Sequence, residues 1–532
     1  MWALGWLSYE AATALDPTLV TREEDDFPPL WFALFERPYH EQQMPPSFVS
    51  IAPPQWSPTV SEDDYRGAVD RVKELIRRGD TYQVNYSFRL QARASDDPER
   101  LFASMIAVQG GRYSSYIDAG RYVVCSASPE TLFERIGGAV TCNPMKGTAL
   151  RGRFPQEDAE RHESLLGSSK DQAENVMIVD MVRNDLAQIA ERGSVTTAPH
   201  CAIEAYPRVF QMTRGVQATS GRPLSELLRA LYPAASITGA PKARTMEIIA
   251  DVETTPRRIY TGSVGFITPE GREVFNVAIR TVLIDRVLDQ MEYGVGSGIV
   301  WDSAWESEYH ECLAKASVVT TQPKPFELFE TLLWEAGAGF FLVDRHIQRL
   351  RDSCAYFGWH FEEEKVRQEL DKIAAKLQTE GCARRVRVVF DRFRGVHSEV
   401  SPLVPIPVGY TVALARSPVD SDDIFLFHKT TSRSAYDDAV PEVDGVDDVI
   451  LWNERGEVTE SRIANVVLDL EGQLVTPPVY SGLLGGCYRA ELLEAGRIVE
   501  QTITKGDLAR ARSVYLVNSL RKIWPVEVRF NR

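Results

Sequence analysis

The chain of 532 residues has few cysteines and no cysteine cluster. Its seven cysteines are odd in number and scattered, and no two of them form a CxxC pair. This spacing indicates neither a disulfide framework nor a cysteine-based zinc site. A reducing compartment, the cytoplasm, is therefore the expected location.

Long apolar runs and excess positive charge are also missing. No uncharged apolar stretch approaches ~18 residues, and the opening MWALGWLSYEAATALD lacks a basic leader. Lysine and arginine total 59 against 75 aspartate and glutamate, so the net charge is −16. That charge opposes association with nucleic acid or an anionic bilayer. We expect neither partner, and an anionic substrate would need local arginine, lysine, metal or helix N-termini.

What the sequence contains is the composition of a folded protein that mixes helix and strand patterns, with 44% hydrophobic and 25% charged residues. Apolar residues at helical spacing predict a helix from Ser61 to Gly79 and another from Ser168 to Gly193. Each begins with a serine that has an aspartate three residues on, as in a capping box. Alternating apolar residues elsewhere predict strands.

A change of pattern divides the chain into two domains. Pro323 and Pro325 stand in a short polar stretch that predicts a boundary between residues 1–320 and residues 325–532. The second part begins with strand-like FELFETLLWE, continues with a helix over IQRLRDSCAYFGW and returns to strands. The fold class is mixed, α/β or α+β, in both parts.

Two acidic pairs in the first part have the i, i+3 spacing of one helix face. They are Asp171 with Glu174 and Glu308 with Glu311. Most such pairs are solvated surface. Facing each other across a cleft, however, two pairs would form an oxygen-rich Mg²⁺ site, because a small hard cation takes a few carboxylates and completes its shell with water and substrate oxygens.

Three glycine-containing segments of the first part allow a ligand to approach the backbone. PMKGT places Lys146 directly before a glycine, and ITGAPKARTMEII leads into a helix whose N–H groups and Lys242 suit an anion. YGVGSGIVWDS alternates glycines along a strand, Gly296 and Gly298 among them. The plain alternatives are an exposed turn lysine and simple helix initiation.

Taken together, these segments resemble the chorismate-utilising enzyme family. The matching pieces are GDTYQVNYS, SASPE, PMKGT, SSKDQAEN, SITGAPKARTMEII, VAIRT and GSGIVWDSAWESEYHE, in the family's order. The resemblance implies a large domain with antiparallel sheets around a chorismate cleft. It implies Mg²⁺ ligands at Glu174 and Glu311, with Asp171 and Glu308 beside them. It also implies substrate contacts from Arg280, Lys242, Thr238, Gly296 and Gly298.

Lys146 separates subfamilies of that family. Anthranilate, isochorismate and salicylate synthases resemble one another in having alanine there, whereas aminodeoxychorismate synthase component I has lysine. The resemblance implies that Lys146 attacks ring C2 and expels the C4 hydroxyl, with Glu130 of SASPE as the acid, before ammonia enters at C4. A buried site would favour the unprotonated amine that this attack needs. The chain departs from its relatives at Gln211, near a common histidine position.

The nitrogen source is also implied by the resemblance. The chain shows no glutaminase-type nucleophile elbow and has only eight histidines. We therefore expect the substrate to be chorismate, and the nitrogen to come from a separate glutamine amidotransferase subunit or from free ammonia.

The second part carries a lysine and a carboxylate that suit a bound pyridine ring. Lys429 follows the apolar stretch IFLF, where a strand would bury its base and display the amine. Glu460 follows 31 residues later at a turn before another strand, and a carboxylate keeps a pyridine nitrogen protonated. Arg349 suits a phosphate. Without further evidence, a solvated lysine is the plainer interpretation.

From Phe326 to Val526 the chain resembles the class IV pyridoxal phosphate aminotransferases, through FELFET, DRHIQRL, HKTTSR, GEVTESRIANV and YLVNSLRKIWPV. The resemblance implies that Lys429 binds pyridoxal phosphate covalently and that Glu460 pairs with its ring nitrogen. It implies a phosphate site at Arg349, Gly486 and Cys487, although GGCYR departs from the usual pattern. Such domains often dimerise, so a homodimer is expected.

The fusion of the two parts favours a bifunctional enzyme. Class IV proteins include 4-amino-4-deoxychorismate lyases, branched-chain aminotransferases and D-amino-acid aminotransferases. A lyase would use Lys429 to remove the C4 proton and expel pyruvate, which leaves 4-aminobenzoate for folate. One alternative is an anthranilate-type synthase joined to another aminotransferase, which Lys146 opposes. Another is a non-catalytic subunit that docks a glutaminase, which the intact set of candidate residues opposes.

Overall fold

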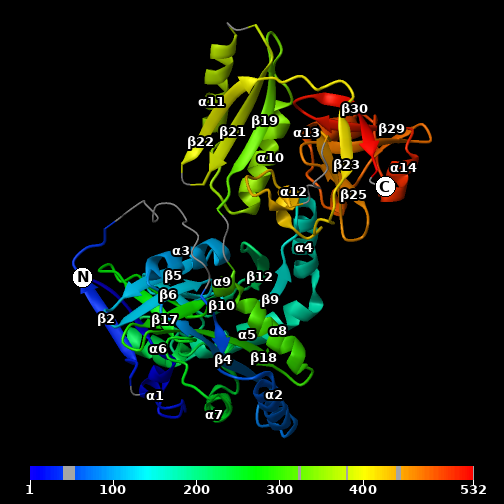
Figure 1. Cartoon of the computed structure of the whole chain (residues 1–532). Coiled ribbons are helices and arrows are strands. Elements are labelled where there is room, and N and C mark those ends of the chain that lie inside the picture. Colours follow the sequence, from blue (N-terminus) through cyan, green and yellow to red (C-terminus); the bar gives the residue numbers. More distant parts are fainter. Residues whose placement is uncertain are drawn as a thin grey trace. The chain divides into compact units, whose positions relative to one another are not determined.

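The computed structural model describes residues 1–24, 26–39, 54–321, 325–378, 381–392, 394–438 and 445–530. The chain divides into two compact units (Figure 1). The first unit comprises Met1–Arg151 and Arg161–Pro323, and the second comprises Gly152–Glu160 and Lys324–Arg532. Pro323, one of the two prolines expected at the boundary, lies outside the described residues.

The first unit is built on three antiparallel sheets. Their strand orders are β10-β13-β8-β7-β16-β15-β1-β2, then β14-β4-β18-β17-β6-β5 with β3 beside β4, and finally β11-β12-β9. The antiparallel architecture expected for this part is confirmed. The strands are β1 (Trp2–Leu7), β2 (Leu30–Phe35), β3 (Ser57–Pro58), β4 (Gln83–Arg93), β5 (Tyr113–Asp118), β6 (Tyr122–Ser128), β7 (Thr131–Ile136), β8 (Ala139–Cys142), β9 (Met145–Leu150), β10 (Thr196–Thr197), β11 (Ala202–Ala205), β12 (Val209–Thr213), β13 (Val216–Thr219), β14 (Gly239–Ala240), β15 (Ser263–Ile267), β16 (Glu273–Asn276), β17 (Thr281–Asp285) and β18 (Gln290–Ile299).

The helices of this part begin where short-range capping predicts. Ser61 and Asp64 form a capping box at the start of α2, and Ser168 accepts from the backbone of Asp171 at the start of α5. The second helix ends earlier than the expected Gly193, because the chain turns back onto the carbonyl of Leu186. The helices are α1 (Ala12–Leu15), α2 (Glu62–Arg77), α3 (Pro98–Gln109), α4 (Pro155–Gly167), α5 (Ser169–Ala187), α6 (Leu224–Leu231), α7 (Lys242–Val252), α8 (Trp305–Lys315), α9 (Ser317–Thr320), and the 3₁₀ turns η1 (Tyr9–Ala11) and η2 (Ala235–Ile237).

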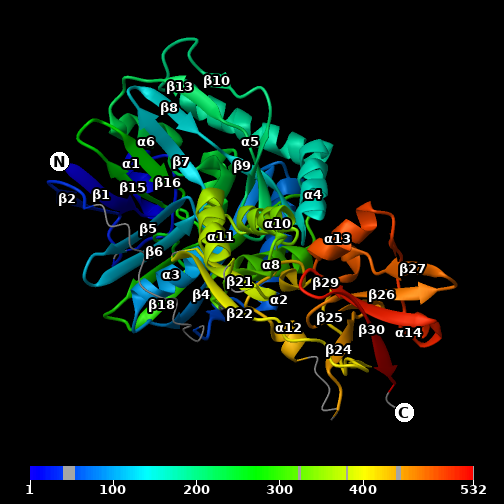
Figure 2. The ribbon, with the colours of Figure 1, turned by 90° about the horizontal axis from the view of Figure 1, so that it is seen from above.

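Aromatic and aliphatic side chains fill the space between the long sheet strands and their helices. Tyr65 of α2 packs against Tyr86 and Phe88 of β4 and against Tyr309 of α8, with ring centroids 5.1–5.7 Å apart. A second cluster joins the eight-stranded sheet to α5 and α6. Figure 2 shows α5 near β9, which it contacts. These cores fix the strands that carry the candidate residues.

The second unit has a four-stranded sheet and a larger mixed sheet. The strand orders are β20-β19-β21-β22 and β25-β24-β23-β30-β29-β26-β27-β28. In the larger sheet β23 runs parallel to β24 and to β30. The strands are β19 (Leu328–Glu335), β20 (Gly339–Phe340), β21 (Arg384–Asp391), β22 (Gly395–Pro402), β23 (Thr411–Leu414), β24 (Asp448–Trp452), β25 (Val458–Ser461), β26 (Asn465–Leu470), β27 (Gln473–Thr476), β28 (Val499–Glu500), β29 (Ser513–Asn518) and β30 (Lys522–Arg529).

The apolar stretch before Lys429 is a 3₁₀ turn rather than the expected strand. The carboxylate of Asp423 accepts a hydrogen bond of 2.9 Å from the backbone of Phe425 and so caps that turn. Glu460 also differs from expectation. It lies within the strand β25, whereas the sequence predicts a turn before another strand at this residue. The helices are α10 (Val343–Tyr356), α11 (Glu363–Leu377), α12 (Ser434–Asp437), α13 (Cys487–Glu494), α14 (Lys505–Arg510), and the turns η3 (Ile424–Leu426) and η4 (Val479–Ser481).

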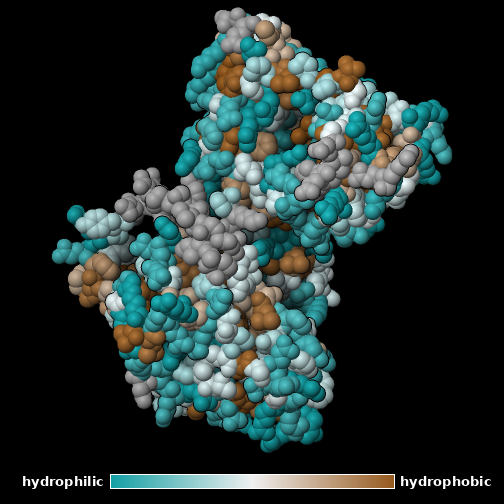
Figure 3. Space-filling view, in the orientation of Figure 1, coloured by the Kyte–Doolittle hydropathy of each residue, from teal (hydrophilic) through white to brown (hydrophobic). Residues whose placement is uncertain are grey.

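The surface is largely hydrophilic on the face that Figure 3 shows, with apolar residues in separate small groups. No helix within the described ranges is both long and apolar enough to cross a membrane.

Candidate functional site

Lys146 lies on β9, between a neighbouring strand and a covering helix. Opposite Thr148 on β9 stands Gln211 of β12, so the glutamine is on the strand beside the lysine. The amide of Asn175 in α5 donates to the carbonyl of Lys146 over 3.3 Å. Gly147 has a φ of +96°, and a Cβ there would lie 3.1 Å from that of Asp171. A glycine is therefore required for α5 to pack on this strand.

The two carboxylates of the acidic pair on α5 have different partners: Glu174 pairs with Lys146, and Asp171 takes part in the helix cap. The ammonium of Lys146 lies 3.6 Å from a carboxylate oxygen of Glu174, and the two side chains are 35% and 39% exposed. Asp171 accepts instead from the hydroxyl of Ser168 over 2.5 Å. Lys146 is thus ion-paired and about one-third exposed, whereas a buried site would favour the unprotonated amine that the attack needs.

Lys315, which the sequence analysis did not single out, connects the residues expected at the other side of the cleft. Its ammonium donates to the carbonyl of Gly296 over 2.9 Å and pairs with Glu311 over 2.6 Å. Its carbonyl accepts from the guanidinium of Arg280. The structure therefore brings together Arg280, Gly296 and Glu311, three residues that the sequence selected separately.

The four carboxylates do not form a ready metal site. Among the residues that the structure describes, no group of three or more His, Cys, Asp or Glu side chains is arranged to hold a metal ion. Glu174 and Glu311 are each paired with a lysine, so a cation would have to displace both lysines. The arrangement does not fit Mg²⁺ as it stands, and the magnesium expectation stays a prediction.

Glu130 is a buried carboxyl between β6 and β7. Burial raises its pKa to about 7, and the single side-chain hydrogen bond, 2.9 Å from the hydroxyl of Ser236, opposes that rise. Its side chain lines a small cavity together with Pro144, Asp185 and Ser236. A carboxyl that keeps its proton near neutral pH is suited to act as a general acid.

The polar groups of Lys242 and Thr238 form hydrogen bonds with other residues of the protein. The ammonium of Lys242 donates to a carboxylate oxygen of Asp185 over 2.9 Å. The hydroxyl of Thr238 donates to the carbonyl of Ala234 over 3.2 Å. Helix α7 begins at Lys242, as the sequence predicts, but the lysine that was expected to hold an anion is already paired.

The alternating glycines of β18 face β4. A Cβ on Gly296 would lie 2.7 Å from Ser87, whose backbone cannot yield, so packing between the strands requires that glycine. A Cβ on Gly298 would meet only the flexible side chain of Gln83 at 2.8 Å. Of the two, Gly298 leaves more room for a ligand close to its backbone.

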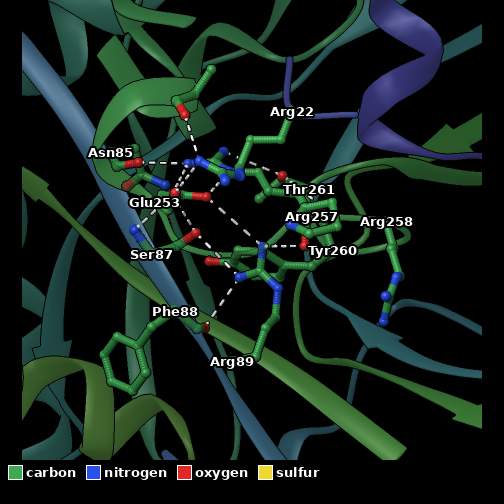
Figure 4. Close-up of polar contacts among 12 residues, drawn as sticks. Arg22, Asn85, Ser87, Phe88, Arg89, Glu253, Arg257, Arg258, Tyr260 and Thr261 are labelled. Atoms are coloured by element: carbon green, nitrogen blue, oxygen red, sulfur yellow. Dashed lines mark hydrogen bonds and ion pairs between the residues drawn. The ribbon is translucent and has the colours of Figure 1, made fainter. Parts of the chain in front are cut away.

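A buried ionic network supports β4 and the turn before α7 (Figure 4). Glu253 accepts from Ser87 over 2.7 Å and pairs with Arg257 over 2.7 Å. The guanidinium of Arg257 also donates to the carbonyls of Ile237 and Asn85 over 2.9 and 2.7 Å. These bonds hold the segment with Thr238 against the strand that faces Gly298. Sequence patterns did not reveal the network.

Arg257→Met is expected to lower the free energy of unfolding of the first unit by about 3 kcal/mol, because the buried carboxylate of Glu253 loses its close charged partner and keeps only Ser87 and, at 3.9 Å, Arg89. Urea denaturation measures the loss. Adding Glu253→Gln to the variant should restore part of it. The matched control is Arg77→Met in the exposed pair with Glu74, expected to change stability by about 1 kcal/mol or less. Equal losses from both arginines would contradict the prediction.

Lys429 has the character of a reactive amine. Burial, together with the nearby charge of Arg349, lowers its pKa to about 8, and Glu330 and Glu460 oppose the shift. The ammonium lies 4.8 Å from the ring centre of Phe329, whose backbone N–H donates to the carbonyl of Lys429 over 2.9 Å. A substantial fraction of this amine is unprotonated near pH 8.

Glu460 is held by three donors. Tyr436 donates over 2.8 Å and the backbone of Leu484 over 3.0 Å to one oxygen, and Asn465 donates over 3.1 Å to the other. Burial raises the pKa of Glu460 to about 7, against these hydrogen bonds. The second oxygen keeps room for one more donor.

Arg349 is anchored by Glu330, a residue that the sequence analysis missed. Two hydrogen bonds of 2.8 and 2.6 Å join them, and His346 contacts the same carboxylate over 2.7 Å. Burial acts to raise the pKa of Glu330, but Arg349 and His346 lower it to about 2. Burial likewise raises the pKa of the Cys487 thiol, yet Arg349 and His346 bring it below its usual value. The ionised Glu330 therefore offsets the charge of Arg349, and its carboxylate raises the pKa of His346 against the effect of burial.

Gly486 precedes α13 at a point where no side chain fits. A Cβ there would lie 2.0 Å from the amide oxygen of Asn465, the residue that also donates to Glu460. The guanidinium of Arg349 donates to the carbonyl of Gly485 over 3.1 Å. Lys429, Glu460 and the cluster of Arg349 at the start of α13 thus belong to one unit, and their roles toward a cofactor stay predictions.

Comparison with known proteins identifies the families of both units. Residues 1–321 match the chorismate binding enzyme family, and residues 327–528 match amino-transferase class IV. The chain is 37% identical over 257 residues to anthranilate synthase component 1 1 of Haloarcula marismortui, over 48% of this chain and 52% of that protein. It is 34% identical over 283 residues to aminodeoxychorismate synthase component 1 of Escherichia coli, over 53% and 62%.

The curated relatives do not choose between those two activities, because proteins of both names match at similar identity. The chain spans about half the length of the curated relatives it matches. A solved structure, anthranilate synthase component I from Streptococcus pneumoniae, has a TM-score of 0.53 at 26% identity and covers 60% of this chain and 80% of its own. The chain belongs to the chorismate binding enzyme family, and an amino-transferase class IV domain follows in the same chain.

Proposed function

We propose that the chain makes 4-aminobenzoate in two steps. In the first, chorismate and ammonia give 4-amino-4-deoxychorismate and water. In the second, that product is split into 4-aminobenzoate and pyruvate. The observation that carries the proposal is the lysine on β9, where Lys146 stands beside Glu174 in a chorismate-binding unit.

In the first unit, Lys146 acts as the nucleophile and Glu130 as the acid when the C4 hydroxyl of chorismate is replaced. The amine of Lys146 attacks ring C2 while Glu130, with its raised pKa, protonates the departing C4 hydroxyl, which leaves as water. Ammonia then adds at C4 and displaces the lysine. For the attack, the proton of Lys146 passes to a base, and its carboxylate neighbour Glu174 is positioned to take it. Arg280 holds a substrate carboxylate.

In the second unit, the residues fit pyridoxal phosphate, the cofactor that the class IV family implies. Lys429 supplies the amine that binds the cofactor, Glu460 has an oxygen available for the ring N–H, and the cluster of Arg349 at the N-terminus of α13 suits the phosphate. When bound, the cofactor withdraws electrons from the carbon that loses a proton. The amine of Lys429 then moves the C4 proton as pyruvate departs.

The partners follow from the same proposal. We infer a glutamine amidotransferase subunit as the source of ammonia, with free ammonia as a substitute, and a homodimer formed through the second unit. The cytoplasm is the proposed location. Magnesium stays an expectation, which loss of amination on chelation and its return on adding Mg²⁺ would support.

Product analysis tests the proposal. The full chain is incubated with chorismate, MgCl₂, pyridoxal phosphate and ammonium, and products are separated and weighed by mass spectrometry. We expect 4-aminobenzoate and pyruvate in equal amounts. Anthranilate as the aromatic amine would instead establish the anthranilate-type alternative. No amine, even with glutamine and a glutaminase partner, would favour a non-catalytic subunit.

The ratio of the amination rate of the unaltered chain to that of Glu130→Gln is expected to fall as the pH rises through about 7, because the acid form of Glu130 is present below its pKa and is lost above it, whereas the other titrating groups are the same in both proteins. Initial rates of both proteins from pH 6 to 9, with the concentration of unprotonated ammonia held constant, measure this ratio. Below pH 7, Glu130→Gln should lower the rate by about 10²–10⁴-fold. A ratio that stays constant through pH 7 would refute the role of Glu130.

A further inference from the structure

A short segment that matches the chorismate-binding family folds as part of the second unit. It is Gly152–Glu160, which follows the strand of Lys146 in the sequence. Within this segment Phe154 is 7% exposed and belongs to an apolar cluster with Leu426, Phe427 and Tyr436. The second unit therefore draws part of its core from outside the class IV region.

Phe154 contacts an aromatic residue that lies shortly before the proposed cofactor lysine. Its ring stacks on that of Phe427, two residues before Lys429, with centroids 5.3 Å apart and an angle of 23°. It meets the ring of Tyr480 edge-on at 4.9 Å. Tyr436, in the same cluster, donates to Glu460 over 2.8 Å. One aromatic side chain thus packs against the lysine segment, and it belongs to the same apolar cluster as the tyrosine that supports the ring-nitrogen carboxyl.

Polar contacts fasten the segment on both sides of Phe154. The guanidinium of Arg153 donates to the carbonyl of Ser421 over 2.9 Å and lies 5.3 Å from the ring centre of Phe427. Farther along, Glu160 accepts from the hydroxyl of Tyr480 over 3.0 Å. These bonds hold Phe154 at one place in the cluster.

The lysine segment needs such support, because it belongs to no sheet. Lys429 follows the 3₁₀ turn Ile424–Leu426, and an isolated bridge between Thr430 and Leu328 joins this segment to β19, where Phe329 donates to the carbonyl of Lys429 over 2.9 Å. These bonds fix the backbone after the turn, whereas the turn has few backbone hydrogen bonds of its own, so side-chain packing contributes to the direction of the lysine. Phe427 provides that packing, and Phe154 covers it.

We propose that Phe154 is a positioning residue for the cofactor site, which holds Lys429 and Glu460 in register through Phe427 and Tyr436. The inference rests on the cofactor that the class IV family implies and not on which substrate the second unit takes. Its consequence is that residues 325–532 are an incomplete cofactor unit without Gly152–Glu160.

Phe154→Ala in the full chain tests the proposal. Pyridoxal phosphate binding is followed by absorbance titration, and attachment to Lys429 by borohydride reduction and mass analysis across pH 6 to 10. We expect binding about tenfold weaker, because the truncated ring leaves a cavity beside Phe427. We also expect the midpoint of attachment to move to higher pH, because a less buried Lys429 has a pKa closer to that of free lysine.

The matched control is Tyr410→Ala in a separate core of the same unit. Tyr410 is 7% exposed, like Phe154, and packs edge-on against Trp524 at 6.3 Å. Tyr410→Ala should destabilise the unit without moving the pH midpoint. Phe154→Leu, which refills most of the space, should recover most of the affinity and the original midpoint.

Three results would overturn the proposal. They are an unchanged affinity and midpoint in Phe154→Ala, an equal midpoint shift in Tyr410→Ala, or a Phe154→Leu variant that folds yet shows no recovery. Amination of chorismate measured in the same Phe154→Ala preparation should be unchanged, and its presence or absence reports separately on the proposed function of the first unit.

Discussion

Lys146→Ala is expected to lower the rate of chorismate amination by about 10³-fold or more. In the proposed mechanism this amine forms the bond that expels the C4 hydroxyl, and removing a nucleophile leaves only substrate binding and acid catalysis. The fold should tolerate the change, because the pair with Glu174 is more than one-third exposed on both sides. Such a pair contributes about 1 kcal/mol or less.

The measurement is 4-amino-4-deoxychorismate formation in the full chain with ammonium as the nitrogen source. Lys170→Ala is the matched control. This exposed lysine lies on α5, the helix that carries Glu174, one residue before Asp171, and it has no role in the proposed site. The control should keep the unaltered rate. Full activity in Lys146→Ala would remove the lysine from the mechanism and restore the anthranilate-type alternative.

Elements set by short-range chemistry were predictable from the sequence. The caps at Ser61 and Ser168 and the helix start after Pro241 appear where their patterns indicate. In each case a side chain or ring acts on its own backbone, so distant residues have little influence. The segments that resemble the chorismate-utilising family likewise lie on strands and helices in the structure.

Contacts between distant residues were not predictable in the same way. Lys242 lies at its expected helix start, yet its amine donates a hydrogen bond to the carboxylate of Asp185 on α5. Lys315 carries no motif, but it joins Arg280, Gly296 and Glu311. A sequence pattern indicates which face a residue occupies, whereas the partner of a charge depends on how separate elements pack.

The second unit shows the same limit over a longer distance. The run IFLF is too short for its apolar period to separate a strand from a turn, and it forms a 3₁₀ turn. Nothing in the spacing of Phe154, eight residues after Lys146, indicates that its ring packs with Phe427. Only the folded chain shows that a piece of the first family region completes the second core.

Lys429→Ala is expected to stop 4-aminobenzoate formation, by about 10³-fold or more, while amination continues and 4-amino-4-deoxychorismate accumulates. The amine both binds the cofactor and moves the C4 proton in the proposed mechanism, so alanine removes two functions at once. Borohydride should then attach no cofactor to the second unit. Lys372→Ala, at an exposed lysine on α11, is the control and should keep both steps.

Mixing the two variants separates the steps most sharply. Lys146→Ala retains the lysine of the second unit, and Lys429→Ala retains that of the first, so a mixture should form 4-aminobenzoate from chorismate when neither variant alone does. The variant Lys146→Ala should also convert added 4-amino-4-deoxychorismate at the unaltered rate. Failure of that conversion would deny the second unit its lyase role, because its own residues are intact in this variant. Success would show that each lysine serves one step, as the separate clusters around Glu174 and Glu460 require.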